Sequence, residues 1–162
     1  MSRIDDLARA TRSGIVAVIR AESDELLVEV ARALAAGGVD VLEVTFTVPR
    51  AEKVLERVAA ALGDEVLLGA GTVLDPETAR TALLAGARFV VSPTLNFEVI
   101  RLCHRYDRLV FPGAFTPTEV LAAWEAGADA VKVFPVDAVG PGYLKALRGP
   151  LPQVRLLPTG GI

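Results

Sequence analysis

The sequence predicts an α/β fold, a (β/α)8 TIM barrel with an N-terminal helix, in a chain that ends in its seventh strand. Apolar, β-branched segments alternate with helical ones at a period of about 22 residues along all 162 residues, which requires a parallel sheet. Two of the apolar strands also carry a charged residue at mid-length, Glu43 and Lys132. An open doubly wound sheet satisfies the alternation too, but its two helix-covered faces leave no room for these charges. A barrel interior with a polar site accommodates them.

Each predicted element has its own sequence signal. Ile4, Leu7 and Ala8 lie at helical spacing and predict a leading helix at residues 2–12. Apolar runs predict strands at residues 14–20, 39–46, 66–73, 88–93, 109–115, 130–135 and 155–162. Helices are predicted between the strands at residues 24–36, 49–62, 76 onward, 96–105, 117–127 and 143–147. Two of them begin with an N-cap residue followed by proline in the first turn, at Asp75-Pro76 and Thr116-Pro117.

The predicted barrel is one strand short. Barrels of this kind have eight strands and typically about 200 residues or more, whereas the seventh predicted strand here is the last. The composition shows no break that would indicate a linker, so we expect residues 1–162 to form one barrel domain. We also expect that this domain lacks its final helix-strand-helix of about 40 residues, two repeats of the chain's own period.

Composition narrows the classes of protein. The chain is 52% hydrophobic and 23% charged, which provides a large core and excludes a disordered chain. The net charge of −3 argues against a nucleic-acid or membrane partner. The start of the chain lacks the apolar core of a signal peptide, and the single cysteine, Cys103, suits a reducing compartment. We therefore expect a soluble, cytoplasmic protein. One cysteine and one histidine, His104, cannot assemble a metal cluster of soft ligands, so no metal is expected.

Lys132 is the most informative residue. The alternation of a strand places it on one face with Ala130 and Phe134, opposite an apolar face that suits a layer of helices. Burial of an ammonium group costs several kcal/mol, so Lys132 either extends to a polar partner or loses its proton and becomes a nucleophile that attacks carbonyl carbons. Glu43 lies on another even-numbered strand, and the two side chains can meet across a barrel lumen. They form either a structural ion pair or the amine and carboxyl group that Schiff-base chemistry needs.

Three further features lie at predicted strand ends. The segment Gly69-Ala70-Gly71-Thr72 predicts a tight turn that needs positive φ. It could also hold a carboxylate with its backbone amides and the Thr72 hydroxyl, and the two interpretations are compatible. Arg20 ends the first strand, where it is either an exposed charge or an anion ligand at the barrel rim. Gly160-Gly161 lies where such barrels bind phosphate on backbone amides.

Taken together, these motifs resemble those of the KDPG/KHG aldolases, which cleave 2-dehydro-3-deoxy-6-phosphogluconate and 4-hydroxy-2-oxoglutarate. The resemblance covers the whole chain through six segments, LEVT at 42–45, GAGTV at 69–73, SP at 92–93, FPG at 111–113, AVKVFP at 130–135 and PTGG at 158–161. It implies a homotrimeric (β/α)8 class I aldolase that needs no cofactor and acts on a small 2-oxo acid. It also implies roles for matching residues: Lys132 as Schiff-base lysine, Glu43 as general acid and base, Thr72 for the carboxylate, Pro93 and Phe134 as pocket lining, and Gly160 and Gly161 for the phosphate.

Two departures from the family pattern bear on substrate binding. Some members carry an arginine four residues after the glutamate, where this chain has Thr47, so Arg20 or, second, Arg50 is expected to supply that charge. The family also draws a phosphate ligand from the loop after strand eight, which this chain does not contain. The alternatives are a phosphosugar isomerase or epimerase that uses lysine and glutamate without a covalent bond, and an inactive truncated relative that serves as a binding module.

Overall fold

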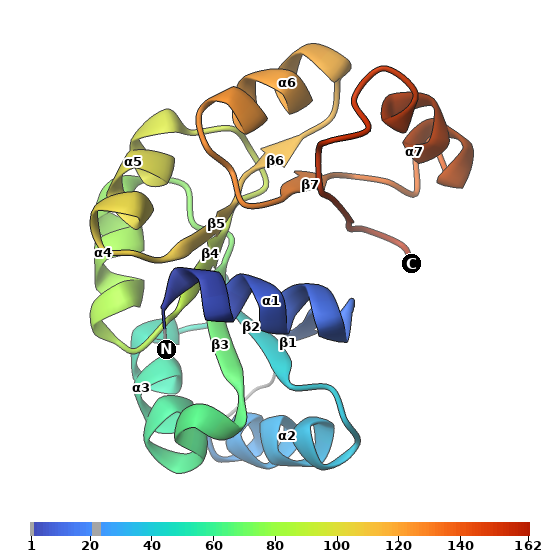
Figure 1. The fold of residues 1–162 in the computed structure, drawn as a ribbon. Helices are drawn as coiled ribbons and strands as arrows, with labels where there is room; N and C mark the ends of the chain where they lie inside the picture. The colour runs from blue at the N-terminus through green and yellow to red at the C-terminus, as the bar shows by residue number, and fades with distance from the viewer. Residues whose placement is uncertain (1, 21–23) are drawn as a thin grey trace.

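The computed structural model describes residues 2–20 and 24–162, which form an arc of parallel strands with helices around its outside (Figure 1). The first half contains α1 (Arg3–Ser13), β1 (Ala17–Ile19), α2 (Asp24–Ala36), β2 (Val41–Thr45), α3 (Ala51–Leu62), the short 3-10 helix η1 (Gly63–Glu65), β3 (Leu67–Gly71) and α4 (Pro76–Leu84). The second half contains β4 (Phe89–Val91), α5 (Phe97–Arg105), β5 (Leu109–Phe111), β6 (Gly113–Ala114), α6 (Pro117–Glu125), β7 (Val131–Val133), α7 (Pro141–Arg148) and β8 (Leu156–Pro158).

The strands form two parallel sheets, one in the order β1-β2-β3-β4-β5 and the other in the order β6-β7-β8. The segment predicted as one strand at 109–115 is therefore two strands, and that prediction is wrong in detail. The interruption is at Pro112, which has no backbone N–H to donate to a neighbouring strand. The Pro112 carbonyl still accepts a hydrogen bond of 2.9 Å from the Lys132 amide, so β5 and β6 follow one path along the arc.

The helix boundaries follow local capping signals. Asp75 and Thr116 cap α4 and α6 as predicted, each accepting a hydrogen bond from a backbone amide of the first turn with a proline at the helix start. Asn96 caps α5 in the same way. The strands are shorter than their apolar runs: the first predicted strand, 14–20, contains β1 at 17–19 only. The residues of that run outside β1, such as Ile15 and Val16, continue the apolar pattern without pairing and are exposed or half-buried.

The core has an outer and an inner part. The outer faces of β1–β5 pack on α2–α5, and those of β6–β8 pack on α6 and α7. The inner part is an apolar cluster inside the arc formed by Val41, Leu67, Phe89, Val91, Leu109 and Phe111. The rings of Phe89 and Phe111 lie 5.5 Å apart within it. The strand faces opposite the helices are thus filled by side chains, as in a barrel.

Helix α1 crosses the end of the arc where the strands begin (Figure 1). Three of its residues, at successive helical turns, form ion pairs with loops that precede strands: Arg3 with Asp129, Asp6 with Arg88, and Arg9 with Asp40. Asp6 is fully buried, so loss of its ion-pair partner would leave an uncompensated charge inside the fold and lower the stability strongly. These ion pairs close one end of the arc and leave the opposite end for a site.

Candidate active site

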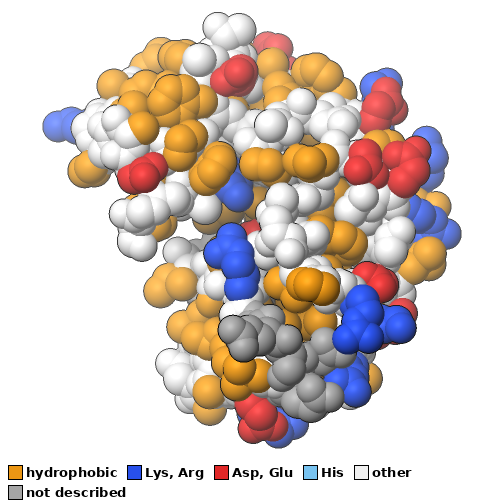
Figure 2. All heavy atoms as spheres, turned by 180° about the vertical axis from the view of Figure 1, so that it is seen from behind, with side chains coloured by type: hydrophobic (Ala, Val, Ile, Leu, Met, Phe, Trp, Pro, Cys, Tyr) orange, Lys and Arg blue, Asp and Glu red, His pale blue; other side chains and the backbone are white. Residues whose placement is uncertain are grey.

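Lys132 and Glu43 both lie inside the arc, on β7 and β2. Their residues are 6% and 3% exposed, and both line one cavity of about 770 Å³. The neighbours of Lys132 on its strand, Val131 and Val133, are buried against α6 and α7 on the outer side, which places Lys132 on the inner side. The face opposite α1 is hollowed, with basic side chains beside the hollow (Figure 2).

The two charged groups are not paired directly. Among the described residues neither the Lys132 ammonium nor the Glu43 carboxyl group takes part in an ion pair or a side-chain hydrogen bond. The Lys132 Nζ lies 5.0 Å from the centroid of the Phe134 ring. Both polar ends are consequently available to a molecule that occupies the cavity.

The position of Glu43 depends on a glycine of the neighbouring strand. Gly71 pairs with Thr45 on β2, and a Cβ at Gly71 would lie 1.7 Å from the Glu43 Oε1 atom. Gly69 makes room for a core side chain in the same way, because a Cβ there would lie 2.3 Å from the Phe89 ring. The prediction that these glycines serve a turn with positive φ is wrong: both lie within β3, and the positive φ of 59° belongs to Thr72. The glycines are needed for close approach.

The eight residues singled out from the sequence all line this cavity. Arg20 follows β1, Thr72 follows β3, Pro93 follows β4, and Phe134 follows β7. Gly160 and Gly161 follow β8, with φ of 99° and 67°. Each of these six lies beyond the carboxyl end of its strand. The six come together because parallel strands of an arc end on the same rim. Sequence positions more than a hundred residues apart therefore meet around Glu43 and Lys132.

Burial drives both central groups toward their uncharged forms. It lowers the pKa of Lys132, with the nearby Glu43 carboxylate opposing that effect and the Arg20 guanidinium adding to it. Burial raises the pKa of Glu43, and the positive charges of Lys132 and Arg20 oppose this. A free amine next to a carboxyl group that can hold a proton can add to a ketone and then protonate the hydroxyl group that leaves.

Several lining residues were not identified from the sequence: Ile15, Val16, Val18, Leu157, Pro158 and Thr159. The signal that could have found Val18 and Leu157 is the alternation used for Lys132, since Val16, Val18 and Arg20 share one strand face and Leu157 and Thr159 share another. In contrast, Thr47 and Arg50 are absent from the lining. Thr47 is exposed and contacts the Thr45 hydroxyl at 2.8 Å, and Arg50 is the N-cap of α3.

Three other features of the described part of the chain concern metal ligands, His104 and the apolar length of the helices. No group of three or more His, Cys, Asp or Glu residues there could hold a metal ion. His104, set aside from the sequence, lies near α1, where its Nε2 atom is 3.0 Å from the Arg3 guanidinium. None of the described helices is long and apolar enough to cross a membrane.

Comparison with known proteins decides the family. Residues 5–162 match the family model described as KDPG and KHG aldolase. This chain belongs to the KDPG and KHG aldolase family. It is 38% identical to the 2-dehydro-3-deoxy-6-phosphogalactonate aldolase of Escherichia coli over 94% of this chain and 75% of that protein. It is 37% identical to the 2-dehydro-3-deoxy-phosphogluconate aldolase of Pseudomonas aeruginosa over 99% of this chain and 72% of that protein.

Solved structures of aldolases of this family superpose closely on the chain. A 2-keto-3-deoxy-6-phosphogluconate aldolase of Zymomonas mobilis, solved with 3-phosphoglycerate, has a TM-score of 0.88 and 32% identity over 98% of this chain and 75% of that one. A KDPG aldolase of Legionella pneumophila, with pyruvate captured as a covalent carbinolamine, has a TM-score of 0.85 and 38% identity over 91% of this chain and 71% of that one. The predicted α/β barrel class is confirmed.

Proposed function

We propose that this chain is a class I aldolase that cleaves 2-dehydro-3-deoxy-6-phosphogluconate to pyruvate and glyceraldehyde 3-phosphate, or 4-hydroxy-2-oxoglutarate to pyruvate and glyoxylate. The observation that carries the proposal is the burial of Lys132 beside Glu43 in one cavity, with burial lowering the pKa of the amine and raising that of the acid. Membership of the aldolase family supports the reaction class, and the covalent carbinolamine of the Legionella relative supports the covalent route.

The first half of the reaction builds the Schiff base. The uncharged Lys132 amine adds to the C2 ketone of the substrate and forms a carbinolamine. Glu43, in its acid form, gives its proton to the carbinolamine hydroxyl, which leaves as water, and the nitrogen lone pair completes the C=N bond. The product is a protonated imine on Lys132 and a carboxylate on Glu43.

The second half breaks the carbon chain. The Glu43 carboxylate takes the proton of the C4 hydroxyl, the C3–C4 bond breaks, and its electron pair moves into the imine to give an enamine and a free aldehyde. Glu43 then returns the proton to C3. Water then adds to the protonated imine and gives one proton to the Glu43 carboxylate, and collapse of the carbinolamine releases pyruvate, the free Lys132 amine and Glu43 in its acid form. One acid-base group near the reacting carbons thus serves every proton transfer.

The surrounding residues would bind and orient the substrate. We assign the carboxylate of the pyruvyl end to Thr72, with Arg20 as the positive charge that Thr47 does not supply. Pro93 and Phe134 would line the pocket, and the backbone amides at Gly160 and Gly161 would take the phosphate. A homotrimer is proposed from the family resemblance alone, and sedimentation of the purified chain measures it.

Incubation with pyruvate and sodium borohydride tests the proposal, since borohydride reduces an imine to a stable amine. We expect an added mass at Lys132, which peptide mapping locates, and no adduct in Lys132→Ala or Lys132→Arg, because arginine stays protonated. Glu43→Gln should still form the adduct slowly while turnover falls by about two to four orders of magnitude. Turnover without any adduct would support the isomerase or epimerase alternative instead. A folded chain in which Lys132→Ala changes nothing measurable would support the inactive binding module.

A further inference from the structure

The Phe134 ring lies beside the nitrogen atom on which the proposed reaction takes place. The Lys132 Nζ atom is 5.0 Å from the centroid of this ring, within the distance of about 6 Å at which an aromatic face attracts a cation. Alternation along the chain places both side chains on the inner face of the arc, and both line the site cavity. The ring is thus positioned to interact with any positive charge that this nitrogen carries.

Backbone hydrogen bonds on both sides hold Phe134 in place. Its amide donates to the Ala114 carbonyl at 3.2 Å, which ties it to the segment on one side. On the other side, the Thr159 amide donates to the Val133 carbonyl at 3.0 Å, and the Val136 amide donates to the Thr159 carbonyl at 3.0 Å. The position of the ring is therefore set by the fold of the chain and does not depend on a bound substrate.

The proposed reaction needs a positively charged nitrogen at a position where burial opposes one. Burial and the Arg20 guanidinium both lower the pKa of Lys132, which favours the free amine that attacks the ketone. Loss of water from the carbinolamine then places a full positive charge on the same nitrogen. Glu43 does not balance this charge throughout, because it is uncharged before it gives up its proton and again after it takes the proton of the C4 hydroxyl group.

An aromatic ring stabilises such a cation without keeping the amine protonated. A carboxylate at about 4 Å attracts an ammonium group more strongly than a ring face does, so it would favour the ammonium form of Lys132 over the nucleophile. The ring has no proton to exchange, and its attraction for a cation is the same at every step. Among the described residues, Lys132 forms no ion pair or side-chain hydrogen bond that would outweigh this attraction.

We propose that the Phe134 ring stabilises the positive charge on the Lys132 nitrogen, first in the ammonium group and then in the protonated imine. The part that concerns the imine rests on the aldolase proposal, whereas the contact with the ammonium group rests on the geometry alone. Because the ring attracts the cation and not the free amine, its effect falls on the loss of water from the carbinolamine, which creates the charge. A ring that only lined the pocket would act through its shape instead.

Ring fluorination tests the proposal, because fluorine withdraws electron density from the ring face and leaves the shape of the side chain nearly unchanged. The whole chain is prepared with none, one, two or three ring fluorines on Phe134 alone. Carbon NMR of lysine labelled at Cε measures the pKa of Lys132, since the chain has three lysines and Lys132→Met identifies the signal. We expect this pKa to fall with each added fluorine. With three fluorines, borohydride trapping at saturating pyruvate should be about two- to fivefold slower on its alkaline plateau.

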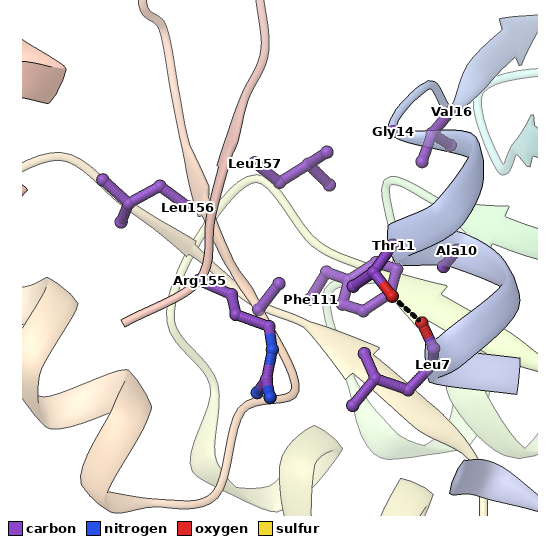
Figure 3. Close-up of a pocket in the computed structure, with 10 residues that line it drawn as sticks. Leu7, Ala10, Thr11, Gly14, Val16, Phe111, Arg155, Leu156 and Leu157 are labelled. Atoms are coloured by element: carbon purple, nitrogen blue, oxygen red, sulfur yellow. Dashed lines mark hydrogen bonds between the residues drawn. The ribbon is translucent and has the colours of Figure 1, made fainter. Parts of the chain in front are cut away.

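Phe111 provides the matched control, because its ring also lies inside the arc but at a distance from the reacting nitrogen. Figure 3 shows this ring in a second cavity, of about 240 Å³, which Leu7 of α1 also lines. Among the described residues, the cation of that cavity, Arg155, lies over the Trp124 ring, 5.8 Å from its centroid. Three fluorines on Phe111 should therefore leave the pKa of Lys132 and the trapping rate unchanged.

If either the pKa of Lys132 or the trapping rate did not depend on the fluorines of Phe134, the proposal would be overturned, as it would by equal effects of fluorines on Phe111. Phe134→Leu keeps an apolar side chain without a ring, should lower the pKa of Lys132 as three fluorines do, and replaces the fluorinated chains should those fail to fold. A pKa that falls with fluorination in a chain without any adduct would sustain the contact with the ammonium group and refute the aldolase proposal, and with it the role at the imine. The two proposals thus fail on different measurements.

Discussion

Replacement of Gly71 by alanine tests the proposed role of Glu43 without altering either charged residue. A Cβ at Gly71 would lie 1.7 Å from the Glu43 Oε1 atom, where an ordinary contact is about 3.5 Å, so the carboxyl group must move by about 2 Å. A misplacement of about 1 Å at a reacting group can cost about 100-fold in rate. We therefore expect Gly71→Ala to lower kcat by about 100-fold or more, while borohydride still traps pyruvate on Lys132.

Gly69→Ala is the matched control, because it makes the same change on the same face of β3. There the new Cβ would lie 2.3 Å from the ring of Phe89, which is fully buried and cannot move away. Overpacking of this kind costs about 1–3 kcal/mol of stability. In Gly71→Ala the atoms displaced are the carboxyl group and Cγ of Glu43, a flexible side chain that borders the cavity, so its stability loss should be smaller.

We therefore expect Gly71→Ala to lose mainly activity and Gly69→Ala to lose mainly stability. Urea unfolding measures the free energy of unfolding, and a lactate dehydrogenase coupled assay of pyruvate release measures kcat. Gly71→Ala should be the less active and the more stable of the pair. If the two variants retained equal kcat, the assignment of Glu43 as the acid-base group would be refuted, whatever their stabilities.

Three further predictions concern charge. Burial lowers the pKa of Lys132, so between its pKa in the folded chain and the unfolded value of about 10.4 the unfolded chain binds more protons, and the free energy of unfolding rises with pH. Urea unfolding between pH 7 and 10 should show this rise in the unaltered chain and not in Lys132→Met. Equal dependence on pH in the two chains would contradict the buried amine. The positive charge of Arg20 lowers the pKa of Lys132 further. Arg20→Gln should therefore move the alkaline rise in the rate of borohydride trapping, measured at saturating pyruvate, to higher pH, and the shift should be smaller at high salt. An unchanged pH profile would show that Arg20 does not affect the pKa of the Lys132 amine. Arg88→Met leaves the fully buried Asp6 carboxylate without its ion-pair partner and should cost about 3–5 kcal/mol in urea unfolding, whereas Arg101→Met on the exposed face of α5 should cost under about 1 kcal/mol.

Much of the fold follows from local sequence signals. Helix positions were predictable because caps such as Asp75 and Thr116 satisfy the first amides of their own helices, which needs only a few neighbouring residues. Strand identity followed from apolar β-branched runs, and the barrel class from the mid-strand charges of Glu43 and Lys132. The break at Pro112 was misjudged because the run around it is apolar throughout, while pairing depends on a backbone N–H that proline lacks.

What the sequence determined about the site is the set of residue types at strand ends, since alternation and strand order fix which side chains face inward and on which rim they end. Only the tertiary structure decided how closely they approach: that Gly71 makes room for the Glu43 carboxyl group, that Arg20 lines the cavity while Thr47 and Arg50 do not, and that α1 closes the opposite end through Asp6 and Arg88. The physical reason is that each of these depends on distances of a few ångströms between segments far apart in the chain. Local propensity carries no information about such distances, and packing alone sets them.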